Sequence, residues 1–182
     1  MEITTDRLLI RPVRAEDWPA LRALWLDFAL SPFARYDKPH PTDPEDVRPR
    51  VARWAEATAA GMEHLFFAIC RGGAVIGYIA FNRRERGYET GYCFHSARHG
   101  MGYAREAFRA LLGEFQRLGV THFSAGTALN NTPSVKLLTA LGFRLTGTEQ
   151  VSFYQDAGGR DIFFDGGLFE LDMDAPSAAS PR

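Results

Sequence analysis

A short glycine-containing loop is the segment of this chain best suited to bind a ligand. Gly100 and Gly102 stand between a strand-like run and the most regular helical pattern in the sequence. The first turn of a helix leaves backbone N–H groups unpaired, and the helix dipole favours an anion there. A plain turn is the alternative. We predict a phosphate-binding loop made of Arg98, His99, Gly100, Met101, Gly102, Tyr103 and Ala104.

Three phosphate ligands compete for this loop: a nucleoside triphosphate, a dinucleotide and the pyrophosphate of coenzyme A. A Walker loop needs Lys and Ser/Thr after its last glycine, whereas Tyr103 and Ala104 follow Gly102. A dinucleotide loop needs a third small residue and an acid about 20 residues later. Arg105 occupies that third position, and residues 115–148 contain no acid. Elimination therefore favours coenzyme A.

Charge is distributed unevenly along the chain. The formal net charge is -1, so there is no global basic field for nucleic acid, and we expect no nucleic-acid partner. A local excess of arginines over glutamates suits a ligand with several phosphates. The arginines are Arg83, Arg84, Arg86, Arg98, Arg105 and Arg109, against Glu85, Glu89 and Glu106.

Five ordered motifs extend over nearly the whole chain and resemble those of the GCN5-related N-acetyltransferases (GNAT). The resemblance is to the RimJ/RimL branch of ribosomal-protein N-terminal acetyltransferases. Any one motif would be weak, but five in order are specific. The motifs are Thr5 to Arg11, Gly91 to His95, His99 to Ala107, Asn131 to Ser134 and Leu141 to Phe143.

The resemblance implies a fold, a co-substrate and a set of contacts. The fold would be the GNAT fold, an α/β (α+β) domain with a central mixed, mostly antiparallel, splayed sheet of about seven strands flanked by helices. Acetyl-CoA would lay its pantetheine arm against the strand that ends near Phe94 and His95, and its pyrophosphate on the amides of residues 99–104. Asn131 would contact the pantetheine or the thioester region. Ala97 departs from the Gln or Arg common in the family, and Arg98 or His99 would replace that contact.

Acetyl transfer needs a neutral amine as nucleophile. Lysine amines titrate near 10.4 and α-amines near 7.7–8.0 in free peptides, so a base must remove a proton, most of all from lysine. Glu89, entering the central strand, is our first candidate, provided that its strand buries it near the splay. An ion pair between Glu89 and the arginines of residues 83–86 is the alternative. His95 is the rival base.

The departing thiolate needs a proton donor. By resemblance to the family this is Ser134, although a first-turn serine could instead cap its own helix. Tyr92 and Tyr154 are alternative phenolic donors. The expected enzyme moves an acetyl group to a primary amine, a protein N-terminus or a small molecule, by direct attack on the thioester. A non-catalytic acyl-CoA-binding sensor or interaction module is the alternative.

Hydrophobic periodicity predicts the elements that position these residues. Ser31 to Pro41 is expected to be a loop, Thr42-Asp43-Pro44-Glu45 a capping box, and Pro49 a break or kink if the following helix starts as early as Asp43. The predicted strands cover residues 7–12, 64–70, 74–82, 88–95, 123–129, 143–154 and 162–171. The predicted helices include one with Pro19 in its first turn and an apolar face from Leu21 to Phe28, a segment that ends near Gly61, Tyr103 to Leu118, and Thr132 to Leu141.

Composition sets the remaining expectations. With 182 residues, 46% of them hydrophobic, we expect one domain over residues 1–174, a disordered tail over residues 175–182, and a monomer or homodimer. No apolar run approaches the roughly 20 residues of a membrane span, and no export signal opens the chain, so the cytoplasm is expected. Cys70 and Cys93 lack metal-ligand spacing, and no metal is expected.

One hypothesis concerns the acceptor. Between Leu145 and Arg182 acids outnumber the two arginines, Arg160 and Arg182. If these acids line the acceptor cleft, they would attract a cationic amine. They are Glu149, Asp156, Asp161, Asp165, Glu170, Asp172 and Asp174.

Overall fold

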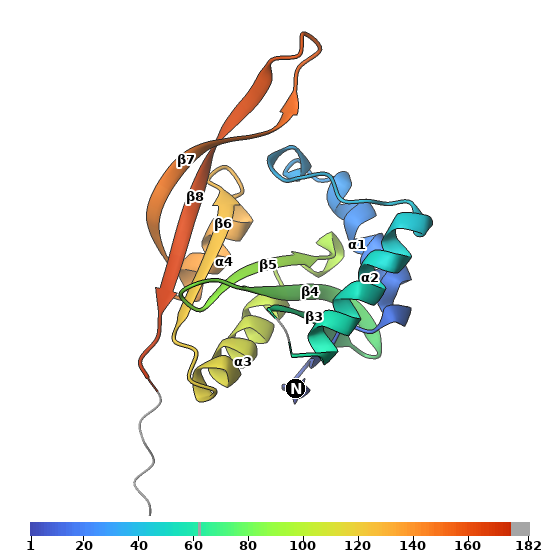
Figure 1. Cartoon of the computed structure of the whole chain (residues 1–182), viewed down its shortest axis with the longest axis vertical. Helices are drawn as coiled ribbons and strands as arrows, with labels where there is room; N and C mark the ends of the chain where they lie inside the picture. Colours follow the sequence, from blue (N-terminus) through green and yellow to red (C-terminus); the bar gives the residue numbers. More distant parts are fainter. Residues whose placement is uncertain (62, 176–182) are drawn as a thin grey trace, which may run out of the picture.

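The computed structural model describes residues 1–61 and 63–175, which form one mixed sheet with helices on both faces (Figure 1). Residues 176–182, most of the predicted tail, lie outside the described residues. The strands are β1 (Ile3–Thr4), β2 (Leu9–Pro12), β3 (His64–Arg71), β4 (Ala74–Arg83), β5 (Tyr88–Phe94), β6 (His122–Ala128), β7 (Arg144–Gln155) and β8 (Asp161–Asp172). The α-helices are α1 (Trp18–Ala29), α2 (Pro44–Ala59), α3 (Tyr103–Arg117) and α4 (Thr132–Ala140), and short 3-10 turns are η1 (Ala15–Asp17), η2 (Ala34–Tyr36) and η3 (Ser96–Arg98).

The sheet has the order β1-β2-β3-β4-β5-β6-β8-β7. Its pairs are antiparallel except for β5 and β6, which are parallel. This confirms the mixed, mostly antiparallel sheet. The strand count is eight rather than seven, because the two-residue β1 is too short to produce a periodic pattern.

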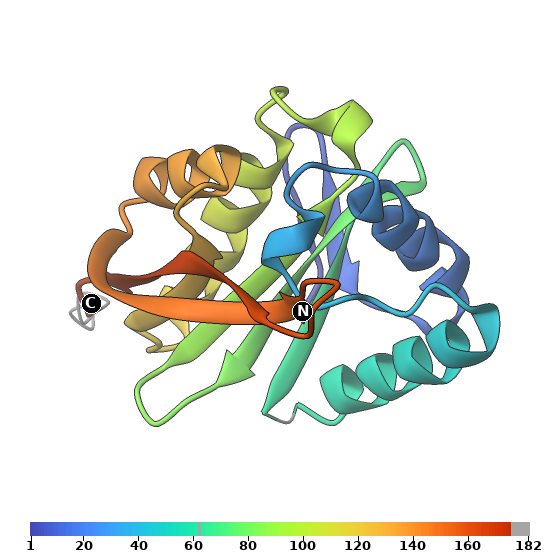
Figure 2. The ribbon, with the colours of Figure 1, turned by 90° about the horizontal axis from the view of Figure 1, so that it is seen from above.

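Alternating side chains on the inner strands create two apolar layers. On β3, Phe66, Ala68 and Cys70 pack with α1 and α2, whereas Phe67 and Ile69 pack with α3. A strand places successive side chains on opposite faces, so a continuous apolar run fits a strand covered on both sides. Figure 2 shows α1 and α2 on one side of the sheet and α3 and α4 on the other.

Helix α2 begins earlier than the position of Pro49 suggested. Its N-cap is Asp43, which accepts a hydrogen bond from the Glu45 amide, so the predicted capping box with Thr42 in the cap position is wrong by one residue. Pro44 opens the helix, where a missing N–H costs little. Pro49 lies inside α2 and does not end it.

Strands β7 and β8 form a long hairpin that projects beyond the rest of the sheet (Figure 1). Its register shifts between Leu145 and Gly147 and again between Ser152 and Tyr154. Strand β7 is the outer strand at this side of the sheet. Among the described residues, no helix is long and apolar enough to cross a membrane.

Candidate active site

Strands β5 and β6 separate along their length. Their parallel pairing comprises Tyr88 with Phe123 and Glu89 with Ser124. Beyond those residues β5 continues to Phe94 and β6 to Ala128 without pairing to each other. The two strands therefore form a splay that opens toward the loop following β5.

A hydrogen-bonded pair of hydroxyls bridges the splay. The Tyr92 hydroxyl on β5 lies 2.7 Å from Ser134 Oγ in the first turn of α4. The Tyr92 ring packs edge-on against Phe108 of α3, at 5.0 Å between centroids. The Ser134 amide donates to Asn131 Oδ1 at 3.3 Å, so Asn131 is the N-cap that starts α4.

The electrostatics of this pair favour hydrogen-bond donation. Burial raises the pKa of Tyr92 to about 12, although the hydrogen bond with Ser134 lowers it in part. Tyr92 is therefore protonated at neutral pH. If its hydroxyl donates to Ser134 Oγ, the Ser134 proton is free to donate to a third group in the splay.

The predicted phosphate-binding loop, residues 98–104 and hereafter the donor loop, presents a row of backbone donors. In the part of the chain that the structure describes, the amides of residues 100–105 donate to no backbone or side-chain acceptor. Gly100 and Gly102 have φ values of 73° and 79°, a left-handed conformation that suits glycine. The His99 amide, included in the predicted cradle, instead donates to the Ser96 carbonyl. The row of amides without an acceptor therefore comprises residues 100–105, one residue later than the predicted 99–104.

Two further contacts fix the start of the loop. Asp27 of α1 accepts hydrogen bonds from the Ser96 amide and the Ser96 hydroxyl, both at 2.7 Å. Burial opposes ionisation of Asp27, but these two hydrogen bonds, together with the charge interactions of His95 and His99, hold the pKa of its carboxyl below the usual value. His99 Nε2 donates to the Phe94 carbonyl at 2.9 Å, which ties the loop back to β5.

Comparison with known proteins identifies this arrangement. The family described as "Acetyltransferase (GNAT) domain" matches residues 7–144. An uncharacterized N-acetyltransferase of Bacillus licheniformis, p20, is 31% identical over 169 residues, which cover 87% of this chain and 89% of the relative. This chain belongs to the GNAT acetyltransferase family.

Solved GNAT structures share the fold. An acetyltransferase of the GNAT family from Bacillus anthracis is 25% identical, with a TM-score of 0.73, covering 94% of this chain and 98% of that one. RimL, a ribosomal L7/L12 alpha-N-protein acetyltransferase in complex with coenzyme A, has a TM-score of 0.80 at 19% identity, covering 97% and 100% of the two chains. This neighbour belongs to the branch that the sequence motifs resemble.

The donor loop, Tyr92 and Ser134 lie at the same end of β5, as expected for a site that binds an acyl donor. Phe94 ends the strand, and its ring lies so close over Gly77 that a Cβ there would fall 2.4 Å from it. Tyr103 is buried in the core, so only its amide faces the loop. The unpaired amides and the left-handed glycines fit the pyrophosphate of a CoA-type ligand.

Glu89 lies at the closed end of the splay, away from this site. It follows Tyr88 in the paired part of β5, and its carboxylate forms an ion pair with Arg84. Its side chain is 38% exposed. The condition under which it could act as a base, burial near the splay, is therefore not met, and the alternative of an ion pair describes its surroundings.

The arginines of residues 83–86 also lie at the closed end. They surround the turn between β4 and β5, one strand length of roughly 20 Å from the loop. Arg86 approaches Asp172 at 3.6 Å rather than the loop. The arginines of this turn therefore lie away from the loop, whereas Arg98 lies on the loop and Arg105 on α3.

His95, the other candidate base, and Tyr154, the other candidate phenol, both form hydrogen bonds outside the Tyr92–Ser134 pair. His95 Nδ1 accepts a hydrogen bond from the Ala97 amide at 3.2 Å, so the neutral ring carries its proton on Nε2 and offers no free lone pair. The Tyr154 hydroxyl donates to the Ala34 carbonyl at 3.4 Å. Tyr154 thus joins β7 to the loop between α1 and α2, rather than to Ser134.

The region opposite the donor loop is lined with aromatic rings. The ring centroids of Tyr36 in η2 and Phe164 in β8 are 5.3 Å apart, and those of Phe164 and Phe153 are 5.6 Å apart. Two of the acids predicted to line the acceptor cleft form other pairs: Asp156 pairs with Arg160, and Asp172 pairs with His122 near Arg86 at the closed end of the splay. The hypothesis of an acid-lined acceptor cleft therefore loses these two carboxylates.

Sequence reasoning gave no role to two residues that hold the donor loop. Asp27 sits in the first predicted helix, and nothing in that helical pattern distinguishes it from a solvent-facing acid. Arg7 belongs to the opening motif of the family resemblance, and its position in that motif was a usable signal. The structure joins Arg7 to both Met101 and Glu106.

Proposed function

We propose that this protein transfers the acetyl group of acetyl-CoA to a primary amine, of a protein N-terminus or a small molecule. The observation that carries the proposal is the Tyr92–Ser134 pair at the open end of the splay, next to the row of free amides. Acetyl-CoA supplies an acetyl thioester whose sulfur leaves as a thiolate. Amides 100–105 would hold its pyrophosphate, and β5 would hold its pantetheine arm near Phe94 and His95.

Ser134 and Tyr92 would stabilise the leaving group by hydrogen bonding. A cysteine-like thiol has a pKa of about 8.5, whereas the pKa of Tyr92 is about 12. Complete proton transfer from Tyr92 to the thiolate would therefore be uphill. The Ser134 hydroxyl would instead donate a hydrogen bond to the developing charge, while Tyr92 orients Ser134.

The acceptor amine can lose its proton without a buried carboxylate if it is an α-amine. With a pKa near 7.7–8.0, a sizeable fraction of α-amines is neutral at physiological pH, whereas lysine amines are almost wholly charged. Since Glu89 is exposed and paired with Arg84, we propose that water accepts the proton and that α-amines are preferred. RimL, a structural neighbour, is described as an alpha-N-protein acetyltransferase.

A screen of amines for coenzyme A release tests this function. The panel contains peptides with free N-termini, polyamines, aminoglycosides and amino acids, with acetyl-CoA as donor. We expect amine-dependent thiol release, with kcat/KM for an α-amine rising through pH 7.7–8.0. Glu89→Gln should retain activity within about twofold, as an exposed substitution does. Saturable coenzyme A binding without release by any amine would support the non-catalytic module instead.

A further inference from the structure

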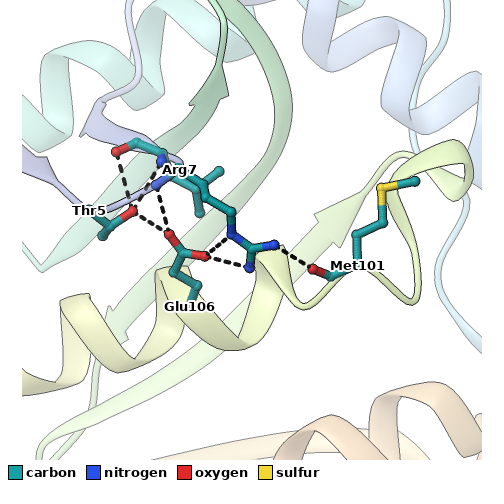
Figure 3. A network of polar contacts seen from close by, with 5 residues as sticks. Thr5, Arg7, Met101 and Glu106 are labelled. Atoms are coloured by element: carbon teal, nitrogen blue, oxygen red, sulfur yellow. Dashed lines mark hydrogen bonds and ion pairs between the residues drawn. The ribbon is translucent and has the colours of Figure 1, made fainter.

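Arg7 connects the N-terminal strands to the donor loop (Figure 3). It lies in the turn between β1 and β2, and its Nη1 donates to the Met101 carbonyl at 2.9 Å. Its Nε lies 2.7 Å and its Nη2 2.6 Å from Glu106 Oε2. One guanidinium thus holds both the loop and the first turn of α3.

Glu106 is also bound by the rest of this turn. The Thr5 hydroxyl donates to Glu106 Oε1 at 2.6 Å, and the Arg7 amide donates to the same oxygen at 3.2 Å. Burial opposes ionisation of Glu106, but these hydrogen bonds and the one from the Arg7 side chain outweigh it, so its pKa lies below the usual value. Glu106 is therefore a fixed anion in the first turn of α3.

The contact with Met101 determines where an amide points. In a trans peptide the C=O and the next N–H point in opposite directions. Since the Met101 carbonyl points to Arg7, the Gly102 N–H points away from Arg7. Rotation of this peptide depends in part on φ of Gly102, which is left-handed at 79°, and Gly102 has no side chain that would restrict that rotation. Arg7 supplies the restraint that Gly102 lacks.

Arg7 also bears on the charge at the helix start. An unpaired carboxylate in the first turn of α3 would oppose a phosphate at the same end of the helix. The Arg7 guanidinium neutralises Glu106, and it lies over the Tyr103 ring at 4.7 Å from the centroid. Arg71 lies near the same ring at 5.1 Å.

We infer that Arg7 is a positioning residue for the donor: it orients the Met101–Gly102 peptide and neutralises Glu106, so that the loop amides can bind the pyrophosphate of the acyl-CoA. The inference rests on the proposed function. Arg7 acts through the loop and does not touch the reacting atoms. Its effect should therefore be confined to donors that carry the pyrophosphate.

The test compares two donors in steady-state kinetics with the same amine. Acetyl-CoA carries the pyrophosphate, and S-acetylpantetheine has the same thioester without it. For Arg7→Gln we expect KM for acetyl-CoA to rise about tenfold, in the range expected for losing hydrogen bonds to a charged group, with kcat nearly unchanged. For S-acetylpantetheine, kcat/KM should equal that of the unaltered protein.

Arg117→Gln is the matched control. Arg117 forms the same kind of pair with Glu114, at 2.6 Å, in the last turn of the same helix. Its loss should leave both donors unaffected. Arg7→Lys keeps the positive charge but lacks the planar fork that serves Met101 and Glu106 together. Its KM for acetyl-CoA should lie between those of the unaltered protein and Arg7→Gln.

The outcomes are distinguishable. An equal loss with both donors would show a general structural role and overturn the inference, as would an unchanged KM for acetyl-CoA. Full recovery in Arg7→Lys would overturn the orienting role and leave only charge neutralisation. Should Arg7→Gln fail to fold, as judged by its thermal unfolding midpoint, Arg7→Lys still decides between these outcomes. If the unaltered protein does not bind coenzyme A, the proposed function itself fails.

Discussion

The donor loop and the β7–β8 hairpin flank the same splay but are held in different ways. The side chains of three residues fasten the loop through polar contacts: Asp27 on α1, Arg7 in the N-terminal turn, and His99 in the loop itself. The hairpin meets η2 through aromatic rings and one long hydrogen bond of 3.4 Å, from Tyr154 to Ala34. Its tip exposes apolar side chains, including Phe163 at 60%.

This difference divides the candidate site into two halves: a constant donor half formed by the loop, and an adaptable acceptor half formed by the β7–β8 hairpin and η2. Under the proposed function, polar anchors with fixed geometry would preserve backbone donors for one invariant group, the pyrophosphate. Aromatic contacts can be exchanged for others without loss of fold, which suits a wall that selects among amines. Substitutions should therefore separate into those that alter donor kinetics and those that alter acceptor kinetics.

The largest effect is expected where the two halves meet. Ser134→Ala should lower kcat about 100-fold, because one hydrogen-bond donor to the developing thiolate is lost. Coenzyme A affinity, measured by calorimetry, should stay within about twofold. The exposed Thr139, also on α4, gives the control Thr139→Ala. A retained kcat in Ser134→Ala would remove Ser134 from the chemistry.

The donor half should respond to backbone strain at Gly100. Gly100→Ala places a Cβ at φ 73°, where an L-residue costs about 1–2 kcal/mol. Coenzyme A affinity should fall about tenfold as the loop relaxes. Gly73 has φ 83° and, like Gly100, no atom within 4 Å of an added Cβ. Gly73→Ala should therefore lower the unfolding temperature without changing coenzyme A affinity; equal losses of affinity would contradict the assignment of the loop.

The acceptor half should respond to Phe164. Phe164→Ala removes the ring that contacts Tyr36, a contact worth about 0.5–1.5 kcal/mol, and should change the amine KM about threefold. KM for acetyl-CoA should not change. Phe163, the exposed neighbour on the opposite face of β8, provides the control Phe163→Ala. A larger change in donor KM than in amine KM would remove the distinction between the halves.

The smallest effect concerns the pH dependence of the loop anchor. The pKa of Asp27 is lowered by folding, so its stabilising contribution is complete above the unfolded value near 3.9 and is lost as the pH falls through the folded value. Asp27→Asn should therefore unfold at a lower temperature than the unaltered protein at pH 7. The difference should shrink below about pH 4, as thermal unfolding monitored by circular dichroism would show. A difference independent of pH would assign the effect to packing.

Most elements of the fold were predictable because their signals are local. The periodic apolar positions of α3 and the apolar runs of β3 and β4 place those elements within one or two residues. The two incorrect predictions, the strand count and the N-cap of α2, also have local causes. Strand β1 has two residues and no period, and the N-cap of α2 depends on which of two adjacent oxygens, in Thr42 or Asp43, reaches the free amide.

The sequence predicted those parts of the candidate site that lie within a single continuous segment of the chain. The loop and the order of motifs indicated the donor region, and the structure brings Tyr92 and Ser134 together from segments 42 residues apart. The placement of Glu89 depended on which end of β5 the splay opens from. That is set by the register of Tyr88 with Phe123, a tertiary property. Asp27 and Arg7 act across the fold, so their partners cannot be read from neighbouring residues.

The two register shifts in the β7–β8 hairpin have a consequence for solubility. Strand β7 is a 12-residue outer strand without proline or lysine, the residues that commonly discourage a second chain from pairing with a free edge. The irregularities at Leu145/Gly147 and Ser152/Tyr154 interrupt this edge and twist it locally. They leave a shorter regular stretch, residues 147–152, available as a template. The two register shifts thus shorten the regular edge on which a second chain could pair edge to edge.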